Sequence, residues 1–83
     1  MNIDDLDSLR DKLGKRIKGL REERGLGVRQ FALIAEIEHP QLINIEKGRV
    51  DLKLATIYKI AKGLKVHPKE LFNIEFLWDG AKG

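Results

Sequence analysis

The stretch VRQFALIAEIEHPQLINIEKG, residues 28–48, carries the patterns of two short helices separated by only a few residues. Its first half repeats apolar residues at the i, i+3, i+4, i+7 spacing of an amphipathic helix: Val28, Phe31, Ala32 and Ala35. In its second half Leu42 and Ile45 lie three apart, and Gly48 marks the end of a helix. The stretch therefore predicts a pair of short helices joined by a tight turn.

Pro40 locates the start of the second helix. Proline favours the first position of a helix, and the residue before it avoids the helical region. We therefore expect His39 to be the N-cap or to lie just outside the helix, and Pro40 to be its first residue. The face opposite Leu42 and Ile45 then carries a mixture that is unusual for a solvated surface: His39, Gln41, Ile43, Asn44 and Lys47.

Three further helices are expected around this pair. Before it, apolar residues recur at steps of 3, 4, 4 and 3, which indicates one long amphipathic helix: Leu6, Leu9, Leu13, Ile17 and Leu20. After it, a similar repeat marks a fourth helix: Leu54, Ile57, Ala61 and Leu64. A short fifth helix is expected from Pro68 through about Asn73. No stretch alternates as a strand does, so the predicted fold class is an all-α domain of five helices with short connections.

Length and composition limit the classes of function that remain. At 83 residues the chain is expected to be a single domain, residues 1–83. It has no cysteine, and its two histidines, His39 and His67, lie far apart, so no metal site is expected. The acidic start MNIDDLDSL is unlike a secretory signal, and no apolar run approaches the roughly 20 residues of a membrane span. We expect a cytoplasmic protein without a membrane partner.

The net charge of +3 is unevenly distributed along the chain. Residues 10–29 contain eight basic and three acidic side chains, whereas the first seven residues contain three acids and no base. A basic block in a small domain indicates a polyanionic partner. The alternative is a solvated helix face, which we prefer for three side chains of the block: Lys12, Lys15 and Lys18.

The order of the segments resembles a known family. The two short helices are joined by only three or four residues and so form a helix-turn-helix. Together with LGKRIKGLREERGL at 13–26, LINIEKGR at 42–49 and LATIYKIAKGLKV at 54–66, they are similar to the Cro and phage-repressor, or Xre-type, family. The resemblance covers about residues 13–72 and places the helix-turn-helix at about 28–47. It implies a five-helix, lambda-repressor-like domain that binds operator DNA in the major groove, usually as a two-fold dimer.

The resemblance also implies which residues read DNA bases. The base-facing positions of the recognition helix fall on His39, Pro40, Gln41 and Asn44, with Ile43 beside them. The amides of Gln41 and Asn44 can pair with N6 and N7 of adenine, and Ile43 can contact a thymine methyl group. For the two amides the alternative is an ordinary solvated helix face, and for His39 it is a role as N-cap.

Phosphate contacts are expected from backbone N–H groups at the starts of the two short helices, that of Val28 included, and from nearby cations. The candidate cations flank these helices: Arg29, Lys47, Arg49 and Lys53. In several family members an arginine late in the first helix pairs with the glutamate of the third helix. The resemblance places this structural ion pair at Arg21 and Glu46.

Four departures from the family pattern concern DNA binding. Gly27 and Val28 stand where a capping Thr or Ser and a phosphate-binding Gln are usual, and Lys53 replaces the usual cap of the fourth helix. Glu36 occupies a turn position usually held by Gly, where another residue needs strain or a different turn. Glu38 replaces a capping Ser. Its carboxylate either weakens DNA binding or selects sites, by accepting from cytosine N4 or repelling wrong sequences.

The end of the chain, with a tail at residues 73–80, is strongly apolar. Five side chains offer more apolar surface than a bundle of this size readily covers: Phe72, Ile74, Phe76, Leu77 and Trp78. We expect some of them to fold back on the first helix near Leu6 and Leu9. The alternative is a symmetric dimer patch.

These patterns favour a sequence-specific DNA-binding transcriptional regulator, a repressor that acts as a homodimer on a palindromic operator in double-stranded DNA. The alternative is a protein-interaction module of the antitoxin or adaptor type, with a protein partner and weak DNA binding. An enzyme is not expected, because Ser8 is the only serine, no catalytic set can be assembled and no Gly-rich phosphate loop is present. No motif indicates a cofactor or a small-molecule substrate.

Overall fold

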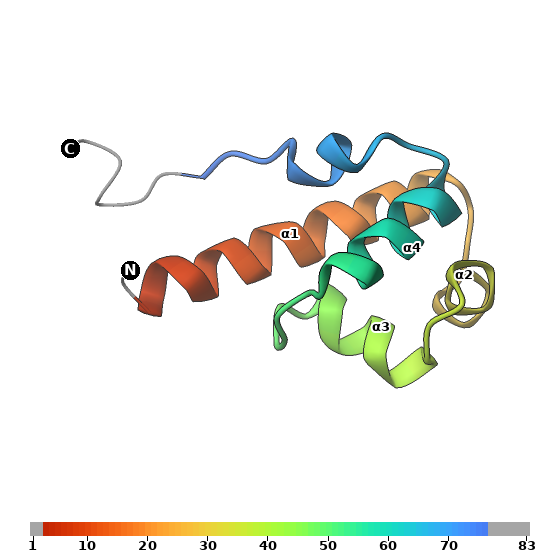
Figure 1. Ribbon diagram of the computed structural model, residues 1–83, viewed down its shortest axis with the longest axis horizontal. Helices are drawn as coiled ribbons and strands as arrows, with labels where there is room; N and C mark the ends of the chain where they lie inside the picture. Colours follow the sequence, from red (N-terminus) through yellow and green to blue (C-terminus); the bar gives the residue numbers. More distant parts are fainter. Residues whose placement is uncertain (1–2, 77–83) are drawn as a thin grey trace.

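The computed structural model describes residues 3–76, which form four α-helices and one short 3-10 helix (Figure 1). The α-helices are α1 (Ile3–Glu23), α2 (Val28–Ala35), α3 (His39–Glu46) and α4 (Leu54–Leu64), and the 3-10 helix is η1 (Pro68–Phe72). No strand occurs among the described residues, so the all-α class is confirmed. None of the described helices is long and apolar enough to cross a membrane.

The fifth predicted helix is present only as η1, which is a 3-10 helix. Its hydrogen bonds join residues three apart, as from the Glu70 N–H to the His67 carbonyl at 2.9 Å and from the Asn73 N–H to the Glu70 carbonyl at 3.3 Å. The segment has only five residues, which leaves little room for α-helical bonds between residues four apart. The predicted count of five helices is therefore replaced by four α-helices and one 3-10 helix.

The long helix α1 is the support on which α3, α4 and η1 pack (Figure 1). It contacts α3, α4 and η1, while α2 packs against α3 and α4. The apolar stripe predicted for α1 is buried at Leu13, Ile17 and Leu20, whereas Leu6 and Leu9 are partly exposed. Every element contributes to one core, whose largest fully buried side chains are Ile17, Phe31, Leu42, Ile60, Leu64 and Leu71.

Gly14 allows α1 and α3 to approach each other closely. A Cβ atom at this position would lie 2.4 Å from the carbonyl oxygen of Ile45 and 2.6 Å from that of Glu46. Since these are backbone atoms of α3, any side chain would push the two helices apart. The contact between the helices thus offsets the roughly 1 kcal/mol that glycine costs inside a helix.

The four α-helices of the described chain end in the same hydrogen-bonded motif, in which one residue takes the left-handed conformation. Glycine holds this position after α1 and α3, where Gly25 and Gly48 have φ of 67° and 71°. After α2 and α4 it is held by Glu36 and Lys65, with φ of 58° and 59°. A residue with a Cβ atom is strained in this conformation by about 1–2 kcal/mol. Two helix ends therefore carry strain.

Gly14→Ala should lower the free energy of unfolding by about 1–3 kcal/mol, the usual cost of overpacking. Gly19→Ala is the matched control, because Gly19 lies in the same helix and a Cβ atom there would meet nothing within 4 Å. In the control variant the free energy of unfolding should rise by about 0.5–1 kcal/mol, because alanine has the better helix propensity. Urea denaturation measures both changes, and equal changes in the two variants would contradict the close contact at Gly14.

Lys65→Gly should stabilise the domain by about 0.5–1 kcal/mol, because it removes left-handed strain at the end of α4 and loses part of that gain to the entropy of glycine. Gly25→Ala introduces the same strain at the end of α1 and should destabilise by about 1 kcal/mol. Thermal unfolding of the two variants measures both effects. A Lys65→Gly variant that melts below the wild type would show that the left-handed residue is not strained.

Candidate nucleic-acid interface

The turn between α2 and α3 is tight although it contains no glycine. Glu36 ends α2 in the left-handed conformation, and the Ile37 N–H donates to the Ala32 carbonyl at 3.0 Å. The sequence left two possibilities for a residue other than glycine at this position, a strained backbone or a different turn. The structure shows the first, because the backbone of Glu36 is left-handed and therefore strained. Ile37 packs against the core and so fixes the turn between the two helices.

Helix α3 begins one residue earlier than predicted. The Leu42 N–H donates to the Glu38 carbonyl at 3.0 Å, so Glu38 is the N-cap, His39 is the first helical residue and Pro40 is the second. The prediction of His39 as N-cap is therefore wrong. Proline lacks only an N–H that no intrahelical bond uses in the first turn, so a helix can begin before it. A capping role no longer explains His39.

Arg21 and Glu46 form a buried ion pair that joins α1 to α3. Arg21 Nε lies 2.7 Å from Glu46 Oε2, and Arg21 Nη2 lies 2.8 Å from Glu46 Oε1. Arg21 Nη1 also donates to the Leu26 carbonyl at 2.8 Å. Each of the paired side chains is 7% exposed. The hydrogen bonds with Glu46 raise the pKa of the Arg21 guanidinium above its ordinary value, so the guanidinium stays charged although it is buried.

The predicted base-reading residues lie on the part of α3 that is turned away from the core. Leu42 and Ile45 are buried and hold the helix on the domain. Pro40 and Gln41 are exposed. The remaining three are partly exposed: His39, Ile43 and Asn44. The structure therefore brings all five residues together on one short helix and leaves them accessible.

The four predicted phosphate-binding cations are exposed around α3: Arg29, Lys47, Arg49 and Lys53. Arg49 Nη1 donates to Asn44 Oδ1 at 3.4 Å, so Arg49 adjoins the base-reading face. Within residues 3–76, no hydrogen bond or ion pair engages the side chains of the other three cations. These three charges are thus available to an anionic ligand.

Backbone donors at three helix starts are also available. The N-cap residues of α2, α3 and α4 are Gly27, Glu38 and Lys53, and none of them makes a side-chain capping hydrogen bond. The first N–H groups of each helix have no intrahelical acceptor, that of Val28 in α2 included. Such groups attract phosphate oxygens.

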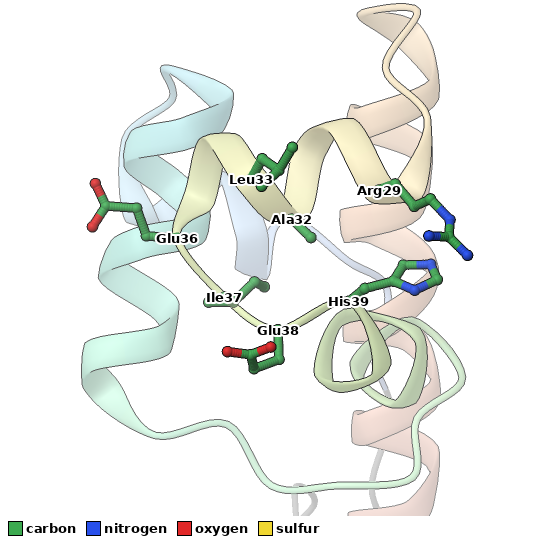
Figure 2. A pocket seen from close by; sticks show the side chains of 7 residues that line it. All are labelled: Arg29, Ala32, Leu33, Glu36, Ile37, Glu38 and His39. Atoms are coloured by element: carbon green, nitrogen blue, oxygen red, sulfur yellow. The ribbon is translucent and has the colours of Figure 1, made fainter.

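An open hollow of about 640 Å³ lies where α2, the turn and α3 meet (Figure 2). Its lining comprises Arg29, Ala32, Leu33, Glu36, Ile37, Glu38 and His39. In Figure 2 the basic Arg29 and His39 lie together on one side, Glu36 lies on the other, and Glu38 lies between them on the turn. The interface thus has a cationic end next to the start of α3 and an acidic end next to α4.

Sequence reasoning missed the exposed apolar side chains of α2. Leu33 projects into the hollow and is 81% exposed, and its neighbour Ile34 is about half-exposed. Tyr58 of α4 lines a second hollow together with Ile34. The signal was present in the sequence, because Leu33 and Ile34 fall outside the apolar repeat that marks the buried face of residues 28–35.

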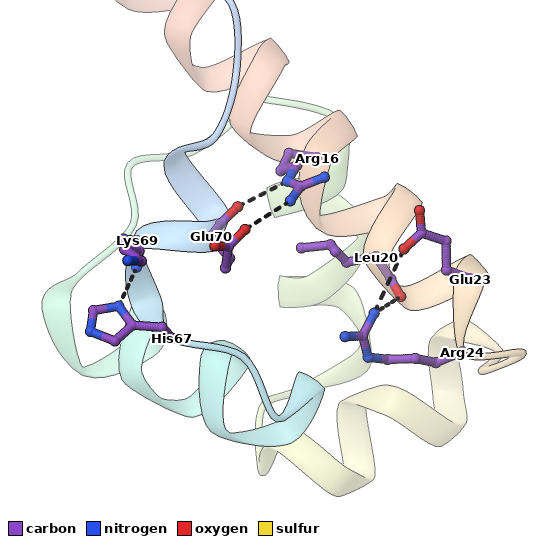
Figure 3. A network of polar contacts seen from close by, with 7 residues as sticks. All are labelled: Arg16, Leu20, Glu23, Arg24, His67, Lys69 and Glu70. Carbon is purple, nitrogen blue, oxygen red and sulfur yellow. Dashed lines mark hydrogen bonds and ion pairs between the residues drawn. The ribbon is translucent and has the colours of Figure 1, made fainter.

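The arginines of the basic block on α1 hold other parts of the fold. Arg16 Nε donates to the Glu70 carbonyl at 2.9 Å, and Arg16 Nη2 lies 3.5 Å from Glu70 Oε2 (Figure 3). Arg24 Nε donates to the last carbonyl of α4 at 2.9 Å, and Arg10 Nη2 lies 2.7 Å from Asp51 Oδ1. These arginines are engaged inside the molecule and are poor candidates for DNA contacts. The solvated face expected for the lysines of this block agrees with Lys15 and Lys18, which are exposed.

The apolar end of the chain is described only in part. Phe72 lines a hollow of about 140 Å³ together with Leu6 and Leu9, where the sequence places a contact with the first helix. Ile74 lies farther along α1, in a hollow that also includes Lys12. Phe76 is partly exposed. The two remaining dimer candidates lie outside the described residues: Leu77 and Trp78.

Comparison with known proteins identifies the family to which the chain belongs. A family model described as "Helix-turn-helix domain" matches residues 14–75, and the chain therefore belongs to the helix-turn-helix domain family. The chain is 38% identical over 74 residues to the HTH-type transcriptional regulator DdrOP3 of Deinococcus deserti. That match covers 87% of this chain and 57% of the relative, so the chain spans little more than half of the relative's length.

Two solved structures resemble the fold closely. The restriction-modification controller protein C.AhdI of Aeromonas hydrophila has a TM-score of 0.73 and 31% identity, over 75% of this chain and 94% of that chain. An HTH_3 family transcriptional regulator from Vibrio cholerae has a TM-score of 0.76 and 28% identity, over 81% of this chain and 38% of that chain. The resemblance to the Xre-type family is confirmed, and this is a class of DNA-binding transcription regulators rather than of enzymes.

Glu46→Ala should lower the free energy of unfolding by about 3–5 kcal/mol, because it leaves the buried Arg21 guanidinium without its partner. Lys15→Ala is the control, since Lys15 pairs with Asp11 on the exposed side of α1 and its loss should cost less than about 1 kcal/mol. Chemical denaturation measures both. A Glu46→Ala variant that unfolds like the wild type and loses only DNA affinity would show that Glu46 is a DNA contact instead.

Proposed function

We propose that the chain is a sequence-specific DNA-binding domain that represses transcription as a homodimer, with α3 in the major groove of a palindromic operator. One observation carries the proposal. Helix α3 is anchored by Leu42, Ile45 and the buried Glu46, yet it leaves Gln41 and Asn44 accessible beside it. Amides on an accessible helix face supply the donors and acceptors that base edges require.

The charges around α3 support the same function. The cations Arg29, Lys47, Arg49 and Lys53 are exposed near this helix, and the first N–H groups of α2, α3 and α4 have no side-chain cap. Contacts of this kind to phosphate fix the register of a helix on duplex DNA. Single-domain organisation over residues 1–83, with the helix-turn-helix at about 28–47, fits this role.

A homodimer is proposed because one short helix reads only a few base pairs. Two copies related by a two-fold axis would place two such helices about one turn of duplex apart, which roughly doubles the contacts. Phe72 and the apolar residues after it are candidates for the contact between the copies. An operator with two inverted half-sites is the corresponding expectation.

A second candidate function is a protein-interaction module of the antitoxin or adaptor type. The exposed apolar side chains of Leu33, Ile34 and Tyr58 favour it, because a contiguous exposed apolar patch is typical of a protein contact surface and Ile34 and Tyr58 line the same hollow. In that case DNA binding would be weak, and these side chains would bind the partner protein.

Selection of bound duplexes from a random library at two salt concentrations separates the two functions. A regulator should enrich one palindrome, and its affinity should fall steeply as salt rises. Asn44→Ala should relax the preference at one base pair per half-site, an effect of about 1–3 kcal/mol. Lys47→Ala should weaken binding to all sequences alike and reduce the salt slope by about one.

Lys18→Ala is the matched control for these variants, since Lys18 is an exposed cation of α1 outside the proposed interface. It should leave both the selected sequence and the salt slope unchanged. A library without an enriched palindrome, combined with binding that does not respond to salt, would reject the DNA-binding function and leave the protein-interaction module.

A further inference from the structure

Glu38 is an acidic residue at the tip of α3 whose carboxylate is unengaged. It is the N-cap of α3, yet its side chain makes no capping hydrogen bond. It is exposed, and no ion pair or hydrogen bond holds its side chain within residues 3–76. Figure 2 shows its carboxylate turned away from the ring of His39. An N-cap side chain that neither caps nor pairs is available to a ligand.

We propose that Glu38 accepts a hydrogen bond from an exocyclic amino group in the major groove, so that each operator half-site requires a cytosine next to the tip of α3. This inference rests on the proposed function, since it needs α3 in the groove. Glu38 directly precedes His39, the first residue of the base-reading helix. On this proposal, with His39 and Gln41 at base edges, the flexible Glu38 side chain contacts the base pair next to theirs.

The chemistry of a carboxylate selects cytosine. An ionised carboxylate only accepts hydrogen bonds, so the base must donate. In the major groove only cytosine N4 and adenine N6 donate, whereas guanine and thymine present acceptors. Adenine N6 lies beside N7, an acceptor that repels the second carboxylate oxygen, and cytosine carries no such acceptor on its major-groove edge. Cytosine is therefore the base that a carboxylate accommodates best.

The surroundings of Glu38 make a carboxylate tolerable near DNA. Arg29 and His39 line the same hollow and lie next to the turn, so their positive or donor groups offset repulsion between Glu38 and phosphates. A carboxylate that only repelled DNA would lower affinity for every sequence alike. One that binds N4 instead lowers affinity only for the wrong base. A position-specific effect and a uniform effect can be measured separately.

The experiment repeats the operator selection with wild type, Glu38→Ala and Glu38→Gln, followed by affinities for the four base pairs at the position concerned. Wild type should prefer cytosine about tenfold or more over the other bases, the scale of one direct base contact. Glu38→Ala should keep the rest of the operator and lose this preference. Glu38→Gln should shift the preference from cytosine to adenine, because an amide both accepts and donates and matches adenine N6 and N7.

Glu36→Gln is the matched control. It neutralises the other exposed acid of the same turn, which lies on the opposite side of the hollow, and its side chain takes no part in the proposed contact. It should leave the preference for cytosine unchanged. If Glu36→Gln removes that preference as Glu38→Gln does, general charge at the turn explains it and the direct contact is rejected.

Two further results would overturn the inference while the proposed function stands. One is an operator that wild type and both Glu38 variants select with equal preference at every position. The other is a Glu38→Ala variant that binds all sequences more tightly by one common factor, which would make Glu38 a general repellent. If wild type enriches no operator at all, the proposed function itself fails, and the inference fails with it.

Discussion

The buried pair between Arg21 and Glu46 is the interaction on which the placement of α3 depends. It crosses from α1 to α3 with two hydrogen bonds of 2.7 and 2.8 Å, and a third bond ties Arg21 to the Leu26 carbonyl between α1 and α2. A buried ion pair adds little net stability, but removing one partner leaves an uncompensated buried charge and is costly. Together with the contact at Gly14, it sets how α3 lies on α1 and therefore which residues α3 presents.

Three more arginines connect α1 and the residue after it to the rest of the fold. Arg10 reaches the loop after α3, Arg16 reaches η1, and Arg24 reaches the end of α4. Arginine suits this task because its guanidinium can donate several hydrogen bonds in a fixed plane. The arginines of this segment therefore make internal connections, whereas Lys15 and Lys18 of the same helix remain exposed.

Local patterns in the sequence were sufficient to predict the helices but not the side-chain contacts that join one helix to another. The spacing of Leu42 and Ile45, with Gly48 after them, predicts α3 because helix periodicity and glycine stops act over a few residues. The contacts of Arg10 and Arg16 join residues 41 and 54 positions apart, and no local pattern encodes them. The pair Arg21–Glu46 was accessible only through the family resemblance. The start of α3 was misplaced by one residue because proline permits two positions in a first turn.

The helix starts differ in whether a side chain caps them. His67 caps η1 by accepting a hydrogen bond from the Lys69 N–H at 3.1 Å, whereas Gly27, Glu38 and Lys53 leave α2, α3 and α4 uncapped. A good side-chain cap is worth about 1 kcal/mol and glycine at an N-cap costs only a few tenths, so the cost of the missing caps falls mainly at Glu38 and Lys53. Departures from local rules cluster at functional sites. If α3 binds DNA as proposed, phosphate oxygens can accept hydrogen bonds from these free N–H groups, and binding would then recover part of the stability that the missing caps cost.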